Sequence, residues 1–111
     1  MSTDPRAAIA AADTALGIEF GSTRIKAVLI GPDHEVLATG GHGWENHLEG
    51  GLWSYSLDEV VVGLQSAYAS LVADVRERYD VTPTSYGSIG ISGMMHGYLA
   101  FDADDNLLAP F

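Results

Sequence analysis

The stretch 17-GIEFGSTRIKAVLI-30 decides how this sequence folds. An apolar run arrives at the carboxylate of Glu19, a bend of small residues follows, and a second apolar run leaves the bend. Gly, Ser and Thr between two apolar runs are typical of a tight connection between β-strands. The stretch therefore predicts two strands, at 16–20 and 24–30, joined by a hairpin turn at 21–23.

This hairpin turn has the composition of an anion site. Small residues leave backbone N–H groups and two hydroxyls open to a ligand. A carboxylate such as Glu19 can hold Mg²⁺ through its waters, and Lys26 adds positive charge. On chemistry alone the motif is unspecific, and an ordinary hairpin turn with Glu19 exposed or hydrogen-bonded is the favoured interpretation. The turn is not a Walker-type P-loop, because that spacing is missing, and not a dinucleotide fingerprint, because no helix follows it.

The pattern on either side predicts an α/β fold. Residues 31–34 form a second turn and 35–41 a third strand, which completes an antiparallel three-stranded meander. Residues 42–55, rich in glycine and aromatic residues and without period, predict a loop. Residues 86–92 predict a strand that follows a helix, and a helical crossover allows it to pair parallel with an earlier strand.

One long helix is predicted ahead of that strand. Ser56 can cap its first turn, and Glu59 three residues on completes a capping-box pattern. Pro83 marks its exit. Its apolar positions follow a 3.6-residue period: Leu57, Val60, Val61, Leu64, Tyr68, Leu71, Val72, Val75 and Tyr79.

The two ends of the chain complete the predicted fold. Residues 97–101 and 107–108 predict a final hairpin around the polar turn 102–106, which lacks the glycine and distal glutamate of a Ca²⁺ loop. We thus expect a mixed five-stranded sheet with one main helix, too few helices to cover both faces, so that one apolar face lies open. The Ala-rich residues 1–14 predict a flexible tail.

Composition limits the partners. Five Lys and Arg against 15 Asp and Glu give a net charge of −10, which argues against nucleic acid but allows a small phosphorylated ligand. The chain has no Cys, which excludes disulfides and thiolate metal sites and fits a cytoplasmic location. The apolar part of the first 15 residues is too short and too broken to span a membrane, so we expect no membrane association.

Several linked motifs together resemble a known family. They are the opening stretch, 34-HEVLATG-40, 52-LWSYSLDEV-60, 89-IGISGMMHG-97 and 98-YLAFDADDNLLAP-110. Their order and spacing over about residues 15–111 resemble the start of an FGGY carbohydrate kinase, xylulokinase-like members in particular. The resemblance implies a ribonuclease-H-like, actin-type ATPase fold. It also implies transfer of the γ-phosphoryl of ATP, with Mg²⁺, to a hydroxyl of a sugar (ketose) or polyol.

The resemblance assigns roles in the first motif. Gly21, Ser22 and Thr23 would form the phosphate-binding turn, with Lys26 beside it. Glu19 stands where the family has Asp, and would hold the metal through water. Because Glu is one methylene longer, the water shell of the metal must shift or the turn must sit further back.

The resemblance also assigns a sugar-contacting corner. Met95 would pack on the carbon skeleton of the sugar and His96 would hydrogen-bond its hydroxyls. Taken alone, His96 is better explained as a helix- or loop-capping histidine with a satisfied hydrogen bond. Met94 is expected in the core.

The other aromatic and histidine residues carry weaker signals. Trp53 is expected to be structural, and the role of Trp44 stays open. His34, His42 and His47 have no regular metal-binding spacing and are expected on the surface.

The family's general base, an Asp, and its adenine pocket come from later parts of such kinases. Residues 15–111 would thus be the first part of the N-terminal domain, with no catalytic residue of its own, inactive alone and completed by the rest of its own chain. An open sheet face could make it a homodimer. Two alternatives stay open: a non-catalytic sugar-sensing or regulatory module, and an actin-like ATPase domain.

Overall fold

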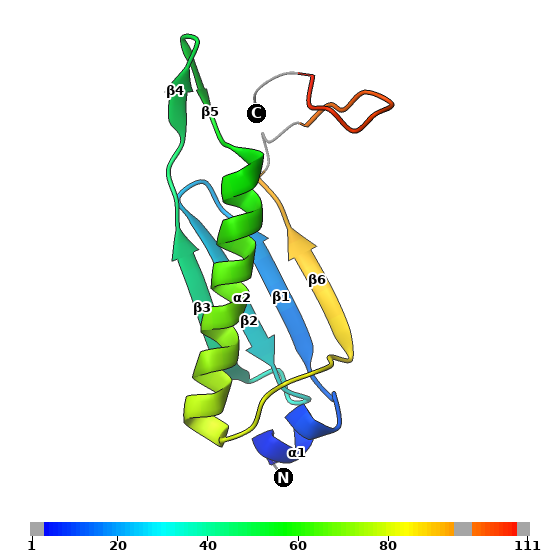
Figure 1. The fold of residues 1–111 in the computed structure, drawn as a ribbon. Helices are drawn as coiled ribbons and strands as arrows, with labels where there is room; N and C mark the ends of the chain where they lie inside the picture. The colour runs from blue at the N-terminus through cyan, green and yellow to red at the C-terminus, as the bar shows by residue number, and fades with distance from the viewer. Residues whose placement is uncertain (1–3, 95–98, 109–111) are drawn as a thin grey trace.

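The computed structural model describes residues 4–94 and 99–108 (Figure 1). It contains two helices and six strands among these residues, in the order α1 (Pro5–Ala10), β1 (Ala15–Phe20), β2 (Arg24–Ile30), β3 (Val36–Gly43), β4 (His47–Glu49), β5 (Leu52–Ser54), α2 (Leu57–Tyr79) and β6 (Ser88–Ser92).

The main sheet has the strand order β3-β2-β1-β6. β1, β2 and β3 form the predicted antiparallel meander, and β6 pairs parallel with β1 after the α2 crossover, as predicted. The expected fifth strand is not part of this sheet in the described residues. The final hairpin contributes one isolated bridge, Phe101 to Leu107, around a turn in which the Asp102 carboxylate accepts the amides of Asp104 and Asn106.

A second, two-stranded sheet stands where a loop is predicted. β4 and β5 pair antiparallel across Gly50 and Gly51, whose φ angles are +56° and +84°. A Gly-Gly pair at positive φ is a preferred two-residue hairpin connection. The signal was present in the sequence as Gly-Gly between two short segments with apolar residues, and the lack of a longer period concealed it.

Helix α2 packs along one face of the main sheet (Figure 1). Its fully buried line consists of Gly63, Ala67, Leu71 and Val75. The predicted stripe is confirmed at Leu71 and Val75, but the prediction is wrong for Val61, which is 53% exposed. The contact line is shifted toward small residues because the helix approaches the sheet closely: a Cβ on Gly40 of β3 would lie 2.3 Å from the backbone of Ala67.

The predicted capping box does not form. Ser56 is the N-cap of α2, but its side chain makes no capping hydrogen bond. Glu59 instead contacts Nε2 of His47 on β4, at 2.9 and 3.0 Å from its two carboxylate oxygens. Glu59 therefore ties the β4–β5 hairpin to the start of α2 rather than capping the helix.

The open face of the sheet is not the apolar face that the sequence predicts. The register places on it Ala15, Gly17, Glu19, Arg24, Lys26, Val28, Ile30, Val36, Thr39, Gly41, Gly43, Ser88, Gly90 and Ser92. Most of these residues are glycine or polar. The exposed apolar side chains of β6, Ile89 and Ile91, lie on the opposite side, in register with the α2-facing Leu16 and Ile18.

Within the predicted N-terminal tail, Pro5–Ala10 form helix α1. Pro5 occupies the first turn and the Asp4 carboxylate caps it by accepting the amide of Arg6 at 3.2 Å. Ile9 is 3% exposed and belongs to the main core with Leu16. Burial of Ile9 stabilises the packing of this helix against the core, and the Ala-rich composition of the segment does not indicate this contact.

The Asp74 carboxylate links α2 to β3, and we expect its contribution to the free energy of unfolding to depend on pH. Its carboxylate accepts the amide of Thr39 and the Nε of Arg78, each at 2.9 Å. These bonds, the Thr39 amide first, hold the pKa of Asp74 below its ordinary value of 3.8. A group whose pKa is lower in the folded state stabilises that state at pH values above its pKa in the unfolded chain. This contribution disappears as the pH falls through the pKa of the folded state.

Asp74→Asn should therefore lower the free energy of unfolding at neutral pH by about 1–2 kcal/mol. The difference from wild type should shrink as the pH falls below about 4. Urea denaturation at several pH values measures it, with the exposed Glu45→Gln as control. An Asp74→Asn deficit that is constant down to acidic pH would contradict the assignment.

Candidate functional site

The β1–β2 connection is a tight turn that requires glycine at its first position. The amide of Gly21 donates to the carbonyl of Arg24 at 2.8 Å. A Cβ on Gly21 would lie 2.9 Å from that same carbonyl oxygen, which is closer than side-chain carbons approach. Ser22 and Thr23 form the exposed tip. The turn thus presents two hydroxyls to solvent, as its composition predicts.

Two aromatic residues hold this turn from behind. The Trp44 indole Nε1 donates to the carbonyl of Gly21 at 2.7 Å, the Tyr55 hydroxyl to that of Ser22 at 2.6 Å, and the Trp44 amide to that of Thr23 at 3.1 Å. The two rings pack with centroids 4.6 Å apart. Every carbonyl of the turn therefore has a donor, and the tip is fixed without use of the hydroxyls of Ser22 and Thr23.

These contacts settle the role of Trp44, which the sequence left open. Trp44 is 7% exposed and belongs to a core cluster with Ile25 and Ala67. It is a structural support for the turn. The sequence predicts a structural role for Trp53. Its side chain is 68% exposed, so burial among the described residues does not support that role.

Glu19 and Lys26 lie side by side at the foot of the turn. They are direct partners in the β1–β2 register, on the open face of the sheet. The Glu19 Oε1 lies 3.8 Å from the position of a Cβ on Gly21, so the longer side chain of Glu reaches the turn. Five of the sequence-predicted residues thus line one hollow of about 250 Å³, together with Arg24: Glu19, Gly21, Ser22, Thr23 and Lys26.

Arg24 is the residue in this hollow that sequence reasoning missed. Its guanidinium lies over Gly41 of β3, where a Cβ would be 2.8 Å from both Nε and Nη2. Gly41 thus provides the space in which Arg24 lies flat on the open face. In a chain with only five Lys and Arg, two of them border this hollow, which makes it a local positive site on an acidic protein.

A wider, shallow hollow continues from the turn along the open face. It has a volume of about 430 Å³ and shares Glu19 and Lys26 with the first hollow; its other residues are Gly17, Ile18, Val28, Gly90, Ile91 and Ser92. Ser92 lies in register with Glu19, so the carboxyl ends of β1 and β6 meet at one edge. Ligands of open α/β sheets bind outside the carboxyl ends of strands.

The donor set of this edge fits a hydrated Mg²⁺. One exposed carboxylate and neighbouring hydroxyls match an ion that keeps several of its waters. Among the residues that the structure describes, no three His, Asp or Glu side chains converge on a point. A metal here would therefore be held mainly through water and through a bound phosphate.

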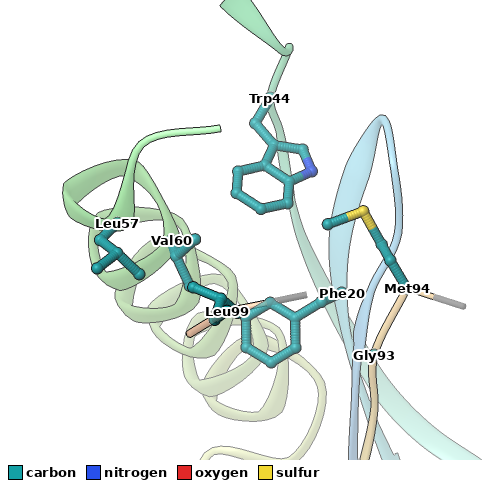
Figure 2. A pocket seen from close by; sticks show the side chains of 7 residues that line it. All are labelled: Phe20, Trp44, Leu57, Val60, Gly93, Met94 and Leu99. Carbon is teal, nitrogen blue, oxygen red and sulfur yellow. The ribbon is translucent and has the colours of Figure 1, made fainter. Parts of the chain in front are cut away.

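Met95 and His96 lie outside the described residues. The chain leading toward them leaves β6 at the same edge as the 21–23 turn. Met94 is partly buried against the Trp44 cluster, which confirms its expected place in the core. Figure 2 shows it beside an apolar pocket of about 260 Å³ lined by Phe20, Trp44, Leu57, Val60, Gly93, Met94 and Leu99.

This apolar pocket lies on the α2 side of β1 and offers no charged side chain. A polyhydroxylated ligand needs hydrogen-bond partners, so the pocket by itself does not suit one.

Neither helix among the described residues has the length and apolar composition of a membrane-spanning segment.

Comparison with known proteins identifies the fold. The chain superimposes on a xyloylose kinase from Brucella ovis with a TM-score of 0.72 and 23% identity, covering 87% of this chain and 20% of the kinase. A gluconate kinase and a ligand-bound xylulose kinase, both from Lactobacillus acidophilus, each give a TM-score of 0.65 and 20% identity. No family model and no curated protein sequence matches the chain.

The described fold is therefore that of the N-terminal part of FGGY sugar kinases, the class to which the resemblance in sequence points. The chain spans about a fifth of the length of the kinases it matches.

Proposed function

We propose that this chain supplies the phosphate-binding wall of an ATP-dependent sugar kinase. The observation that carries the proposal is the 21–23 turn. Its carbonyls are all bonded from behind, and its hydroxyl tip faces a hollow bordered by Lys26, Arg24 and the Glu19 carboxylate. A fixed tip between cations and one carboxylate suits the terminal phosphates of a nucleotide with Mg²⁺.

Each side chain has a separate part in this proposal. Ser22 and Thr23 donate hydroxyl hydrogen bonds to phosphate oxygens, and Lys26 and Arg24 neutralise their charge. Glu19 would hold a Mg²⁺ ion through its waters, and the bound ion would offset the charge of the phosphates. Such a reaction needs positioning and charge stabilisation more than covalent chemistry, so a rigid turn is an advantage.

The acceptor would be a hydroxyl of a ketose or polyol. Met95 and His96 would contact it, because Gly93 and Met94, which precede them, follow the end of β6 at the edge where the turn lies. The general base and the adenine pocket would come from the remaining sequence of a longer kinase. The 111-residue chain alone is then inactive, and ATP-dependent phosphorylation of a sugar by it would contradict the proposal.

The test is turnover of a protein that joins this chain to the rest of such a kinase, assayed with ATP and Mg²⁺ against a panel of ketopentoses, ketohexoses and polyols. The proposal expects phosphorylation of at least one. A folded protein without turnover on the whole panel would instead favour a sugar-sensing or regulatory module. ATP hydrolysis indifferent to every sugar would favour an actin-like ATPase.

Lys26→Ala and Arg24→Ala should each weaken Mg·ATP binding roughly 10- to 100-fold in that protein, because a charge-assisted hydrogen bond contributes about 1.5–3 kcal/mol. Arg76→Ala is the matched control. It removes the same charge at the last turn of α2, at the end of the helix away from the turn (Figure 1). Equal effects of all three variants would indicate a loss of net charge rather than contacts in the hollow.

A further inference from the structure

The hydroxyl of Tyr55 fixes one peptide plane of the 21–23 turn, because it donates to the carbonyl of Ser22 at 2.6 Å. In a planar trans peptide, the carbonyl of one residue and the amide of the next point in opposite directions, and the peptides of the described residues are trans. The bond from Tyr55 therefore directs the amide of Thr23 away from the tyrosine. In the preceding plane, the Trp44 indole holds the carbonyl of Gly21 at 2.7 Å and directs the Ser22 amide away from its own ring.

The two amides lie on the side of the turn opposite the aromatic rings. The rings of Trp44 and Tyr55 pack with centroids 4.6 Å apart, so the two carbonyls that they hold face one side and the amides of Ser22 and Thr23 face the other. Neither amide has an acceptor within residues 4–94 and 99–108. Successive backbone N–H groups that share a side form a concavity that binds anions.

Tyr55 is itself held from two directions. It lies between the end of β5 at Ser54, which is 2% exposed, and the N-cap of α2 at Ser56. The contact between His47 and Glu59, at 2.9 Å, ties the β4–β5 hairpin to the first turn of the same helix. The tyrosine hydroxyl is therefore presented from the junction of two elements rather than from a free loop.

We infer that Tyr55 is a positioning residue for the phosphates. Its hydroxyl keeps the peptide between Ser22 and Thr23 in the orientation in which the Thr23 amide donates to a phosphate oxygen. The hydroxyls of the turn can rotate, whereas this amide has the one direction that the tyrosine sets. The inference rests on the proposed function and adds to it a residue that contacts neither the nucleotide nor the sugar.

The first measurement needs no ligand. Nitrogen relaxation by NMR on the 111-residue chain should give the Thr23 amide an order parameter of about 0.85, typical of rigid backbone, and below about 0.6 in Tyr55→Phe. Phenylalanine keeps the ring against Trp44 and removes only the hydroxyl, so the variant should fold, which circular dichroism verifies. A Thr23 amide that is already mobile in the wild type, or equally rigid in the variant, overturns the inference.

The second measurement is made in the joined kinase described above. Tyr55→Phe should raise the KM for Mg·ATP about 10-fold, the effect of one lost hydrogen bond, and leave the KM for the sugar unchanged. Tyr68→Phe is the matched control, because it removes a tyrosine hydroxyl that lies 2.7 Å from the hydroxyl of Tyr86, beside the other core cluster. It should change neither KM. Equal effects of the two variants, or an equal rise in both KM values, would indicate general destabilisation and overturn the inference.

Failure of this inference and failure of the proposed function give different results. A joined kinase that phosphorylates a sugar, but whose KM for Mg·ATP is the same in Tyr55→Phe, would contradict only the role of Tyr55. A folded joined protein without turnover on the whole panel would contradict the proposed function, and the role of Tyr55 in phosphate binding with it.

Discussion

Replacing Gly40 by alanine is expected to cost about 3 kcal/mol of folding free energy, at the upper end of the usual effect of overpacking. The added Cβ would lie 2.3 Å from both the carbonyl oxygen of Ala67 and the amide nitrogen of Leu71, and 2.9 Å from the Leu71 Cα. These are backbone atoms of α2, which cannot move aside by changing rotamer. The helix must lift from β3, and Leu71, which has no exposed surface, loses its packing.

Urea denaturation measures this loss as a lower midpoint at an unchanged slope. Gly43→Ala is the matched control, because it makes the same substitution on the same strand at a position with nothing within 4 Å of the added Cβ. We expect the control to stay within about 0.5 kcal/mol of wild type. Equal stability of the two variants would mean that α2 does not rest on Gly40.

Trp44→Ala is expected to have the second large effect, about 3–5 kcal/mol on stability. The ring is 7% exposed, so its removal leaves a cavity beside Ile25 and Ala67. The carbonyl of Gly21 also loses the indole N–H. The 21–23 turn should therefore become mobile even under conditions in which the rest of the chain is folded.

Trp44→Phe separates packing from hydrogen bonding. Phenylalanine keeps an aromatic ring but leaves the Gly21 carbonyl unpartnered, a loss of about 1–3 kcal/mol. Amide exchange of Ser22 and Thr23 should increase in both variants. Trp53→Phe is the control, because that ring is 68% exposed. If exchange at the turn is unchanged in Trp44→Phe, the indole N–H does not hold the turn.

The hairpin turn and its flanking strands were predictable because their causes are local. Gly21 is required where the chain turns back on itself, and the apolar runs before and after it are long enough to be strands. The parallel pairing of β6 followed from a helix lying between it and the meander. The grouping of Glu19 and Lys26 followed from the same hairpin, since its register places them opposite each other.

Other features could not be predicted, because residues far apart in the sequence decide them. The support of the turn by Tyr55 spans 33 positions, and the place of Arg24 depends on a glycine of another strand, Gly41. The capping box failed because His47 competes for Glu59. The β4–β5 hairpin was missed because its segments are too short to show a period.

The sequence by itself determined the meander, the crossover and the small-residue turn, since each depends on the period and turn chemistry of neighbouring residues. Only the tertiary structure decided which face is open, what holds the turn, and that α2 does not cover β6 in the described part of the chain. The physical reason is close approach: α2 settles where Gly40, Gly63 and Ala67 leave room for it. That single packing line fixes which strands the helix covers and which strand stays exposed.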